Sequence, residues 1–276
     1  MFIDTHLHLI DRSRLSYPWL SDVPPLDRDW PFQDYVTMAA RLGIEGCLHM
    51  EVDVAEKDIA GETDFVRDMA KGDDGLLIGA ISAARPESET FPAFLDAIDR
   101  SIVRGFRRVL HVVPDDVSQS STFRANIARI GQAGLPFDIC MLARQLPLAR
   151  DLVDTCDSTT FVLDHCGVPD IAGEGYDSWA KEITELARRP HVNAKISGIT
   201  AYTTPEWTLD TLKPYVEHVV ESFGWDRVVW GSDSPVCTLN ASLETWVGTT
   251  HALMAHVSPS ERDKLYRQNA KRIWSL

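Results

Sequence analysis

Basic residues are scarce in this chain of 276 residues. Lysine and arginine together number 27 against 41 aspartates and glutamates, which gives a formal net charge of −14 at pH 7. Nucleic acids and acidic membrane surfaces are bound through clusters of basic residues. The acidic balance therefore argues against both kinds of partner, although a few arginines inside a pocket would still allow an anionic small substrate.

Long apolar runs and a cysteine framework are also lacking. No apolar stretch approaches the roughly 18 residues that a membrane-spanning helix needs. The N-terminus opens directly into a strand-like run that carries Asp4, unlike a secretion signal. The five cysteines are odd in number and include no CxxC pair, so we expect buried, reduced thiols. These absences predict a soluble, cytoplasmic protein.

Short apolar runs alternate with longer helix-like stretches along the whole chain. The runs rich in Val, Ile, Leu and Phe are expected to form strands at 2–8, 44–50, 76–82, 105–112, 136–141, 160–165, 191–196 and 227–233. Helices are expected at 32–42, 57–71, 91–103, 121–133, 145–155, 176–187, 207–223 and 242–256, with a last one from about Pro259, where Ser258 and Ser260 are candidate caps.

This order of elements indicates the fold class. Strand-then-helix repeats imply parallel strands joined by right-handed crossovers, and eight such units favour a closed barrel over an open sheet. No linker or low-complexity tract divides the chain. The sequence therefore predicts one α/β domain over 1–276, a distorted TIM (β/α)8 barrel with an extra C-terminal helix.

One segment, 10–31, interrupts the alternation. It carries Tyr17-Pro18-Trp19-Leu20 and Pro24-Pro25, and is too rich in proline for a helix and too long for an ordinary loop. Because it follows the first strand, it begins at the C-terminal rim, where barrel active sites lie. Trp19 either helps to wall a pocket there or plugs a crevice in a surface loop.

Two histidines end the first predicted strand. Alternation places Asp4, His6 and His8 on the same face of that strand. A pair of histidines at this position either binds a divalent metal or donates hydrogen bonds to a substrate carbonyl oxygen.

The ends of the sixth and eighth strands supply a histidine and a carboxylate. Alternation directs His165 towards the interior and Asp164 towards a helix; otherwise His165 is a core histidine. Asp233 shares a face with Gly231, and a carboxylate there would deprotonate water, bind a metal, or do both. The alternative for Asp233 is the N-cap of the following segment.

Strand 4 carries adjacent arginines, and its face of Arg107, Val109 and His111 is expected to point inward. A buried arginine is costly unless an anionic or carbonyl group meets it. Arg107 therefore indicates either a substrate with a carboxylate or many oxygens, or an ion pair with an acidic neighbour.

Lesser candidates follow the same logic. Lys195 ends strand 7 and either has a structural role or orients an anionic group, and Gln145, which opens the segment after strand 5, either has a structural role or contacts substrate. His49 and Glu51 share a face at the end of strand 2 and are expected to be structural.

These motifs, taken in order, resemble the amidohydrolase superfamily. The similar segments are Asp4-Thr5-His6-Leu7-His8, Tyr17-Pro18-Trp19-Leu20, the arginine-bearing strand 4, Gln145-Leu146-Pro147, Phe161-Val162-Leu163-Asp164-His165, Lys195-Ile196-Ser197-Gly198, Gly231-Ser232-Asp233 and Asn269-Ala270. The chain is most similar to the branch of sugar-acid and pyrone-dicarboxylate lactonases. The resemblance implies a TIM barrel, hydrolysis of a lactone, and roles for His6, His8, His165 and Asp233.

The chain departs from the broader superfamily at two strands. Binuclear members carry a lysine or glutamate on strand 4 and a histidine on strand 5, whereas here strand 4 ends in His111 and strand 5 offers Asp138, Cys140 and Met141. A two-metal centre is not expected, and the branch works with one metal or with none. Ser234 stands where the branch often has tryptophan.

The resulting hypothesis is hydrolysis of a small lactone from carbohydrate or aromatic catabolism. Asp233 is the general base, and His6, His8 and His165 stabilise the oxyanion. They do so directly or through one zinc or manganese ion held by His6, His8 and Asp233. The expected substrate-binding residues are Trp19, Arg107, His111, Gln145 and Lys195.

Other readings fit the same motifs. The scaffold would also support a lactone isomerase, a decarboxylase, or a sugar-acid-binding barrel without turnover. The expected partner is a small molecule, and the acidic surface suits a monomer and a homo-oligomer alike.

Overall fold

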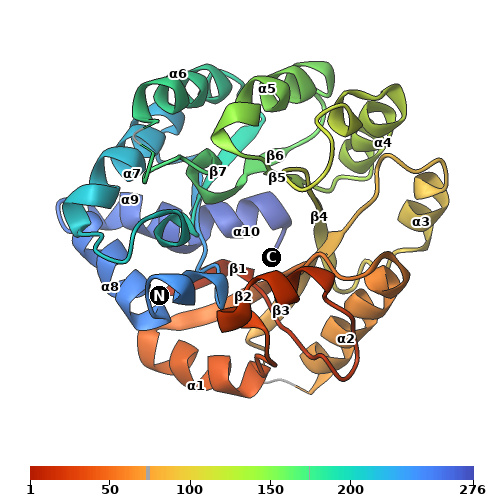
Figure 1. Cartoon of the computed structure of the whole chain (residues 1–276), viewed down its shortest axis with the longest axis horizontal. Helices are drawn as coiled ribbons and strands as arrows, with labels where there is room; N and C mark the ends of the chain where they lie inside the picture. The colour runs from red at the N-terminus through yellow and green to blue at the C-terminus, as the bar shows by residue number, and fades with distance from the viewer. Residues whose placement is uncertain (73–74, 174) are drawn as a thin grey trace.

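Eight parallel strands form the centre of the protein. The structure, a computed structural model, describes residues 1–72, 75–173 and 175–276 and orders the strands β1 to β8 around the sheet (Figure 1). They are β1 (Phe2–Leu7), β2 (Ile44–Met50), β3 (Leu77–Ala83), β4 (Val103–Val109), β5 (Phe137–Cys140), β6 (Phe161–Leu163), β7 (Val192–Ile196) and β8 (Val228–Trp230).

Contacts between the chain just after β8 and the end of β1 bring the two edges of the sheet together. The Asp233 amide donates to the His6 carbonyl at 2.8 Å, and the His8 amide donates to the Ser234 carbonyl at 2.7 Å. The predicted TIM barrel is therefore confirmed, and residues at the two ends of the sequence meet at one rim.

Helices surround the strands, as Figure 1 shows. They are α1 (Phe32–Leu42), α2 (Ile59–Lys71), α3 (Phe91–Ala97), α4 (Ser121–Gln132), α5 (Leu146–Thr155), α6 (Tyr176–Ala187), α7 (Leu209–Phe223), α8 (Leu243–Leu253), α9 (Pro259–Asp263) and α10 (Asn269–Trp274). Ser258 caps α9 as predicted, because its Oγ accepts from the Glu261 amide at 3.3 Å.

The barrel interior is filled by apolar side chains below the rim. Ile3, Leu48, Ile81 and Val229 belong to one buried cluster, which Trp274 of α10 joins. In Figure 1 α10 crosses behind the strands. The C-terminal helix thus closes one end of the barrel and leaves the opposite end for a site.

Some predicted bounds were wrong. The helix expected at 91–103 ends at Ala97, because the chain must enter β4 at Val103. The sixth and eighth strands are shorter than expected, since the backbone turns left-handed at His165 and Asp233, with φ of 54° and 57°. Residues 10–31 form two short 3₁₀ helices, Pro18–Asp22 and Pro24–Leu26.

Among residues 1–72, 75–173 and 175–276, no helix combines the length and the apolar character that crossing a membrane requires.

Candidate active site

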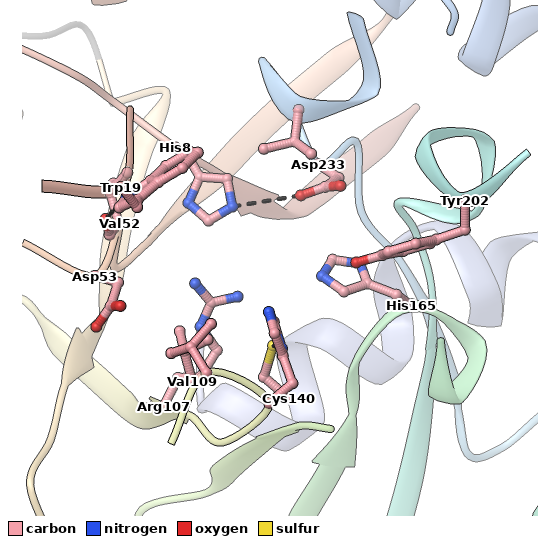
Figure 2. Close-up of a pocket in the computed structure, with 13 residues that line it drawn as sticks. His8, Trp19, Val52, Asp53, Arg107, Val109, Cys140, His165, Tyr202 and Asp233 are labelled. Atoms are coloured by element: carbon pink, nitrogen blue, oxygen red, sulfur yellow. Dashed lines mark hydrogen bonds and ion pairs between the residues drawn. The ribbon is translucent and has the colours of Figure 1, made fainter. Parts of the chain in front are cut away.

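A cavity of about 200 Å³ opens among the loops that follow the strands (Figure 2). Six of the predicted site residues line it: His8, Trp19, Arg107, His111, His165 and Asp233. The other lining residues are Val52, Asp53, Val109, Val112, Cys140, Tyr202 and Val236. Trp19 walls the cavity, and its Nε1 donates to the Val52 carbonyl at 2.8 Å.

Asp233 presents a carboxylate with one uncommitted oxygen. Its Oδ1 lies 3.3 Å from His8 Nε2 and 3.5 Å from His6 Nε2, whereas its buried Oδ2 has no hydrogen-bond partner within the described residues. Burial raises the pKa of Asp233 to about 6. The Asp233 carbonyl, not its side chain, accepts from the Cys237 amide at 2.8 Å, so the N-cap alternative is wrong.

His8 has its proton position set by the backbone. Its Nδ1 lies 3.0 Å from the Met50 carbonyl, which can only accept, so Nδ1 carries the proton. Burial, assisted by the Arg107 charge, lowers the pKa of His8 to about 3, and the ring is neutral. The Nε2 lone pair of His8 therefore faces Asp233, as the dashed line in Figure 2 marks.

His6 lies beneath the cavity and is fully buried. Its Nε2 accepts from Arg107 Nη1 at 3.2 Å, because a guanidinium can only donate. The proton is then on Nδ1, which lies 3.5 Å from Asp164 Oδ1. Lys195 Nζ lies 3.3 Å from the same nitrogen, but its three hydrogens have acceptors in Asp138, Asp164 and the Thr5 carbonyl. Burial holds the pKa of His6 well below its ordinary value.

His165 and Asp164 both point into the barrel, so the prediction that Asp164 faces a helix was wrong. Strand β6 ends at Leu163, and strict alternation ends with it. Asp164 Oδ1 lies 3.0 Å from Lys195 Nζ, and His165 Nδ1 lies 3.0 Å from Ser197 Oγ. Positive φ angles continue through Cys166, Gly167 and Val168.

Gly198 allows His165 and Asp233 to approach each other. The residue has a φ of 58°, a conformation that side chains with a Cβ rarely adopt. A Cβ there would lie 2.6 Å from Asp233 Oδ2 and would also press on His165 Nδ1. Glycine is therefore required at this position by both conformation and space.

Arg107 is an inward arginine held by an acidic neighbour. Its Nε donates to Glu51 Oε1 at 2.6 Å, and its Nη2 donates to the Glu51 carbonyl at 2.7 Å. Burial alone would lower the pKa of Arg107, but the Glu51 carboxylate raises it well above the ordinary value. Arg107 thus both lines the cavity and forms the ion pair that the sequence left as an alternative.

Two predicted substrate-binding residues do not line the cavity. Lys195 is drawn beneath it by two carboxylates, with its Nζ in ion pairs to Asp138 and Asp164. Gln145 supports the loop after β5, because its Nε2 donates to Asp115 Oδ1 at 2.6 Å. Neither side chain is placed to touch a substrate.

Two polar cavity residues were not predicted. Tyr202 ends a 3₁₀ helix after β7, and its ring centroid lies 6.1 Å from that of His165. Asp53 follows β2 with a φ of 44°, and its Oδ1 lies 3.3 Å from Arg85 Nη2. Their only sequence signal is position, since both lie in loops after strands at the rim of the predicted barrel.

Within the described residues, two groups of side chains bring possible metal ligands together. The ligand atoms of His6, His165 and Asp233 all lie within 4.8 Å of one another, as do those of Cys140, Asp164 and His165. Burial raises the pKa of Cys140 far above its ordinary value, and only a thiolate binds metal well. The group that contains Asp233 is therefore the better candidate.

Known proteins resemble this chain in sequence and fold. L-fucono-1,5-lactonase of Burkholderia ambifaria is 28% identical over 246 residues, which cover 86% of this chain and 81% of that protein. 4-Sulfomuconolactone hydrolase of Rhizobium radiobacter is 27% identical over 239 residues, covering 84% and 75%. An amidohydrolase from Burkholderia multivorans solved with bound zinc superposes with a TM-score of 0.91 at 23% identity, over 100% of this chain and 99% of that one. The amidohydrolase family matches residues 3–276, and the chain belongs to it.

Proposed function

We propose that this protein hydrolyses a small lactone, with Asp233 as the general base. The observation that carries the proposal is the uncommitted Asp233 Oδ2, buried in a cavity that also holds His8 and His165. Relatives named as lactonases support the same reaction class, at 28% and 27% identity.

Asp233 has the properties that the first step needs. A carboxylate whose pKa is raised to about 6 is mostly ionised at neutral pH, yet basic enough to accept a proton from attacking water. The water oxygen bonds to the ring carbonyl carbon, and the ester C–O bond then breaks. The proton held by Asp233 passes to the departing alkoxide, which gives a hydroxy acid.

The three histidines do not all stabilise the oxyanion directly, which was the first of the two alternatives expected from the sequence. His8 Nε2 and His6 Nε2 are both acceptors, so neither donates to an oxyanion while its ring is neutral. His165 is the better donor: when Ser197 Oγ–H donates to its Nδ1, its Nε2 carries the proton.

One divalent cation would be held by His6, His8 and Asp233. His8 offers a free Nε2 lone pair 3.3 Å from Asp233 Oδ1, and a backbone carbonyl on Nδ1 is a common way to orient a metal-binding histidine. His6 Nε2 would have to exchange its hydrogen bond from Arg107 for the metal, and His165, whose ligand atom lies within 4.8 Å of those of His6 and Asp233, is a further ligand in reach. Bound zinc or manganese would lower the pKa of water and polarise the lactone carbonyl.

The test is acid release from a panel of lactones, followed with a pH indicator, in the presence and absence of chelator. Wild-type protein should release acid, and Asp233→Asn should lose at least about 1000-fold in turnover. Asp226→Asn, an exposed carboxylate near the opposite end of β8, should retain activity. Turnover by Asp233→Asn near the wild-type level would overturn the base assignment, whereas ring rearrangement without acid release would indicate an isomerase.

A further inference from the structure

We propose that Glu51 is a specificity-determining residue: by neutralising Arg107 it makes the cavity select uncharged lactones and reject lactones that carry a carboxylate or sulfonate. This inference rests on the proposed function. It addresses a choice that the relatives leave open, since one is named for a fuconolactone, which is uncharged, and another for a sulfomuconolactone, which is anionic.

Positive charge is scarce where a substrate would lie. Among the described residues that line the cavity, Arg107 is the one permanent cation, and Asp53 and Asp233 contribute carboxylates. Lys195 lies below, fully buried against carboxylates. His111, which also lines the cavity, adds little charge at neutral pH, because burial lowers its pKa.

The hydrogen bonds of Arg107 are almost fully committed inside the protein. Four of its five N–H groups face protein acceptors: Glu51 Oε1, the Glu51 carbonyl, His6 Nε2 and Asp164 Oδ2. One N–H on Nη2 has no partner within the described part of the chain. It can meet a single neutral oxygen, but it cannot form the two-pronged clamp that guanidinium groups use for carboxylates.

Glu51 is fixed as firmly as the arginine. Its Oε1 accepts from Arg107, and its Oε2 accepts from the Asp53 amide at 2.7 Å. Although burial alone would raise the pKa of Glu51, the guanidinium lowers it, so the carboxylate is ionised. The two side chains are 5% and 1% exposed, and they form a buried pair with no net charge.

The side chains of the cavity therefore offer an anionic lactone no free counter-ion in exchange for its lost hydration. Such a lactone would also lie beside Asp53 and Asp233, and repulsion between like charges is strong where water is excluded. Hydroxyl groups have no such difficulty, since they can donate to Asp53 and accept from the spare Arg107 N–H. A volume of about 200 Å³ also suits a compact sugar lactone, being below the usual range for drug-sized ligands.

The experiment compares two lactones with the same six-carbon skeleton, an aldonolactone and an aldarolactone that retains a free carboxylate. Wild-type protein should prefer the aldonolactone by about 100-fold or more in kcat/KM. Glu51→Gln removes the neutralising charge and should reduce this preference at least about tenfold. Glu51→Asp, which keeps the charge, and Glu89→Gln, which removes an exposed carboxylate outside the cavity, should leave the preference nearly unchanged.

Wild-type protein alone gives a second test that does not depend on the folding of Glu51→Gln. The aldarolactone should inhibit hydrolysis of the aldonolactone only at concentrations well above the KM of the aldonolactone. Equal or better use of the aldarolactone, or a preference unchanged in folded Glu51→Gln, would overturn the role of Glu51 while leaving lactone hydrolysis in place. No turnover of either lactone, nor of the wider panel, would instead reject the proposed function.

Discussion

His8 Nε2 and Asp233 Oδ1 lie 3.3 Å apart, and neither atom carries a hydrogen when His8 is neutral and Asp233 is ionised. The His8 proton is held on Nδ1 by the Met50 carbonyl at 3.0 Å. Two acceptors facing each other are stabilised only when a proton or a cation lies between them. Protonation of Asp233 and metal binding are therefore alternative ways to satisfy this contact, and they lead to different predictions.

Activity of chelator-treated protein should fall as the pH decreases through about 6. Burial raises the pKa of Asp233 to about 6, so below that pH the carboxylate is protonated and cannot act as a base. The measurement is kcat/KM for a neutral lactone from pH 4.5 to 8. A profile that stays flat down to pH 4.5 would contradict the assignment. With zinc present, the acidic limb should move to lower pH, because a nearby cation favours the ionised carboxylate.

Zinc uptake should depend on His8. The protein is expected to bind one zinc per chain, and His8→Asn should weaken binding at least about tenfold, because it removes the Nε2 lone pair that faces Asp233. His256→Asn alters an exposed histidine and serves as the control. Titration calorimetry with zinc alone checks this without any substrate. Equal affinity in wild type and His8→Asn would exclude His8 as a ligand.

Gly198→Ala should impair activity while the protein stays folded. The new Cβ would lie 2.6 Å from Asp233 Oδ2, so the carboxylate or His165 must shift, and displacements of this size cost about 100-fold in rate. Gly43→Ala is a matched control, since Gly43 has a similar positive φ of 72° but no atom of the described residues within 4 Å of the added Cβ. Both variants should lose a little stability, and only Gly198→Ala should lose kcat/KM. Equal activity losses would mean that backbone strain, not the collision, is responsible.

The order of strands and helices could be predicted because apolar periodicity is a local property of the sequence and does not depend on tertiary contacts. Alternation also correctly directed Arg107 into the barrel, since it lies inside a regular strand, β4. It failed at Asp164, which lies beyond the end of β6, where the backbone leaves the extended conformation. The left-handed backbone at His165 could not be predicted from the sequence, because glycine is the residue that normally indicates a positive φ and His165 is not a glycine.

Lys195 shows that sequence patterns do not predict which buried side chains pair with each other. Its place at the end of β7 was evident, but its partners Asp138 and Asp164 follow from side-chain geometry inside the barrel. The spacing of residues along the sequence does not predict such ion pairs, because several strands direct polar side chains into the same part of the barrel interior. For the same reason the neutralisation of Arg107 by Glu51 emerged only from the contacts.

Lys195→Met should be among the most destabilising substitutions in the protein. It would leave Asp138 and Asp164 buried without their ammonium partner, and breaking a buried pair in this way costs about 3–5 kcal/mol. The free energy of unfolding from urea titrations measures the loss. Lys213→Met, which breaks the exposed pair with Glu217, should change stability little.

The loss of unfolding free energy caused by Lys195→Met should also increase with pH. Burial raises the pKa of Asp138 to about 7 in the folded protein, above that of an aspartate in the unfolded chain. Between these two pKa values the folded state binds more protons than the unfolded state, so the folded protein loses stability as the pH rises towards 7. Without Lys195 the folded pKa of Asp138 moves higher, and this loss continues above pH 7. The difference in the free energy of unfolding between wild type and Lys195→Met should therefore be larger at pH 8 than at pH 6. A gap that does not change with pH would show that Asp138 does not take up a proton when the lysine is removed.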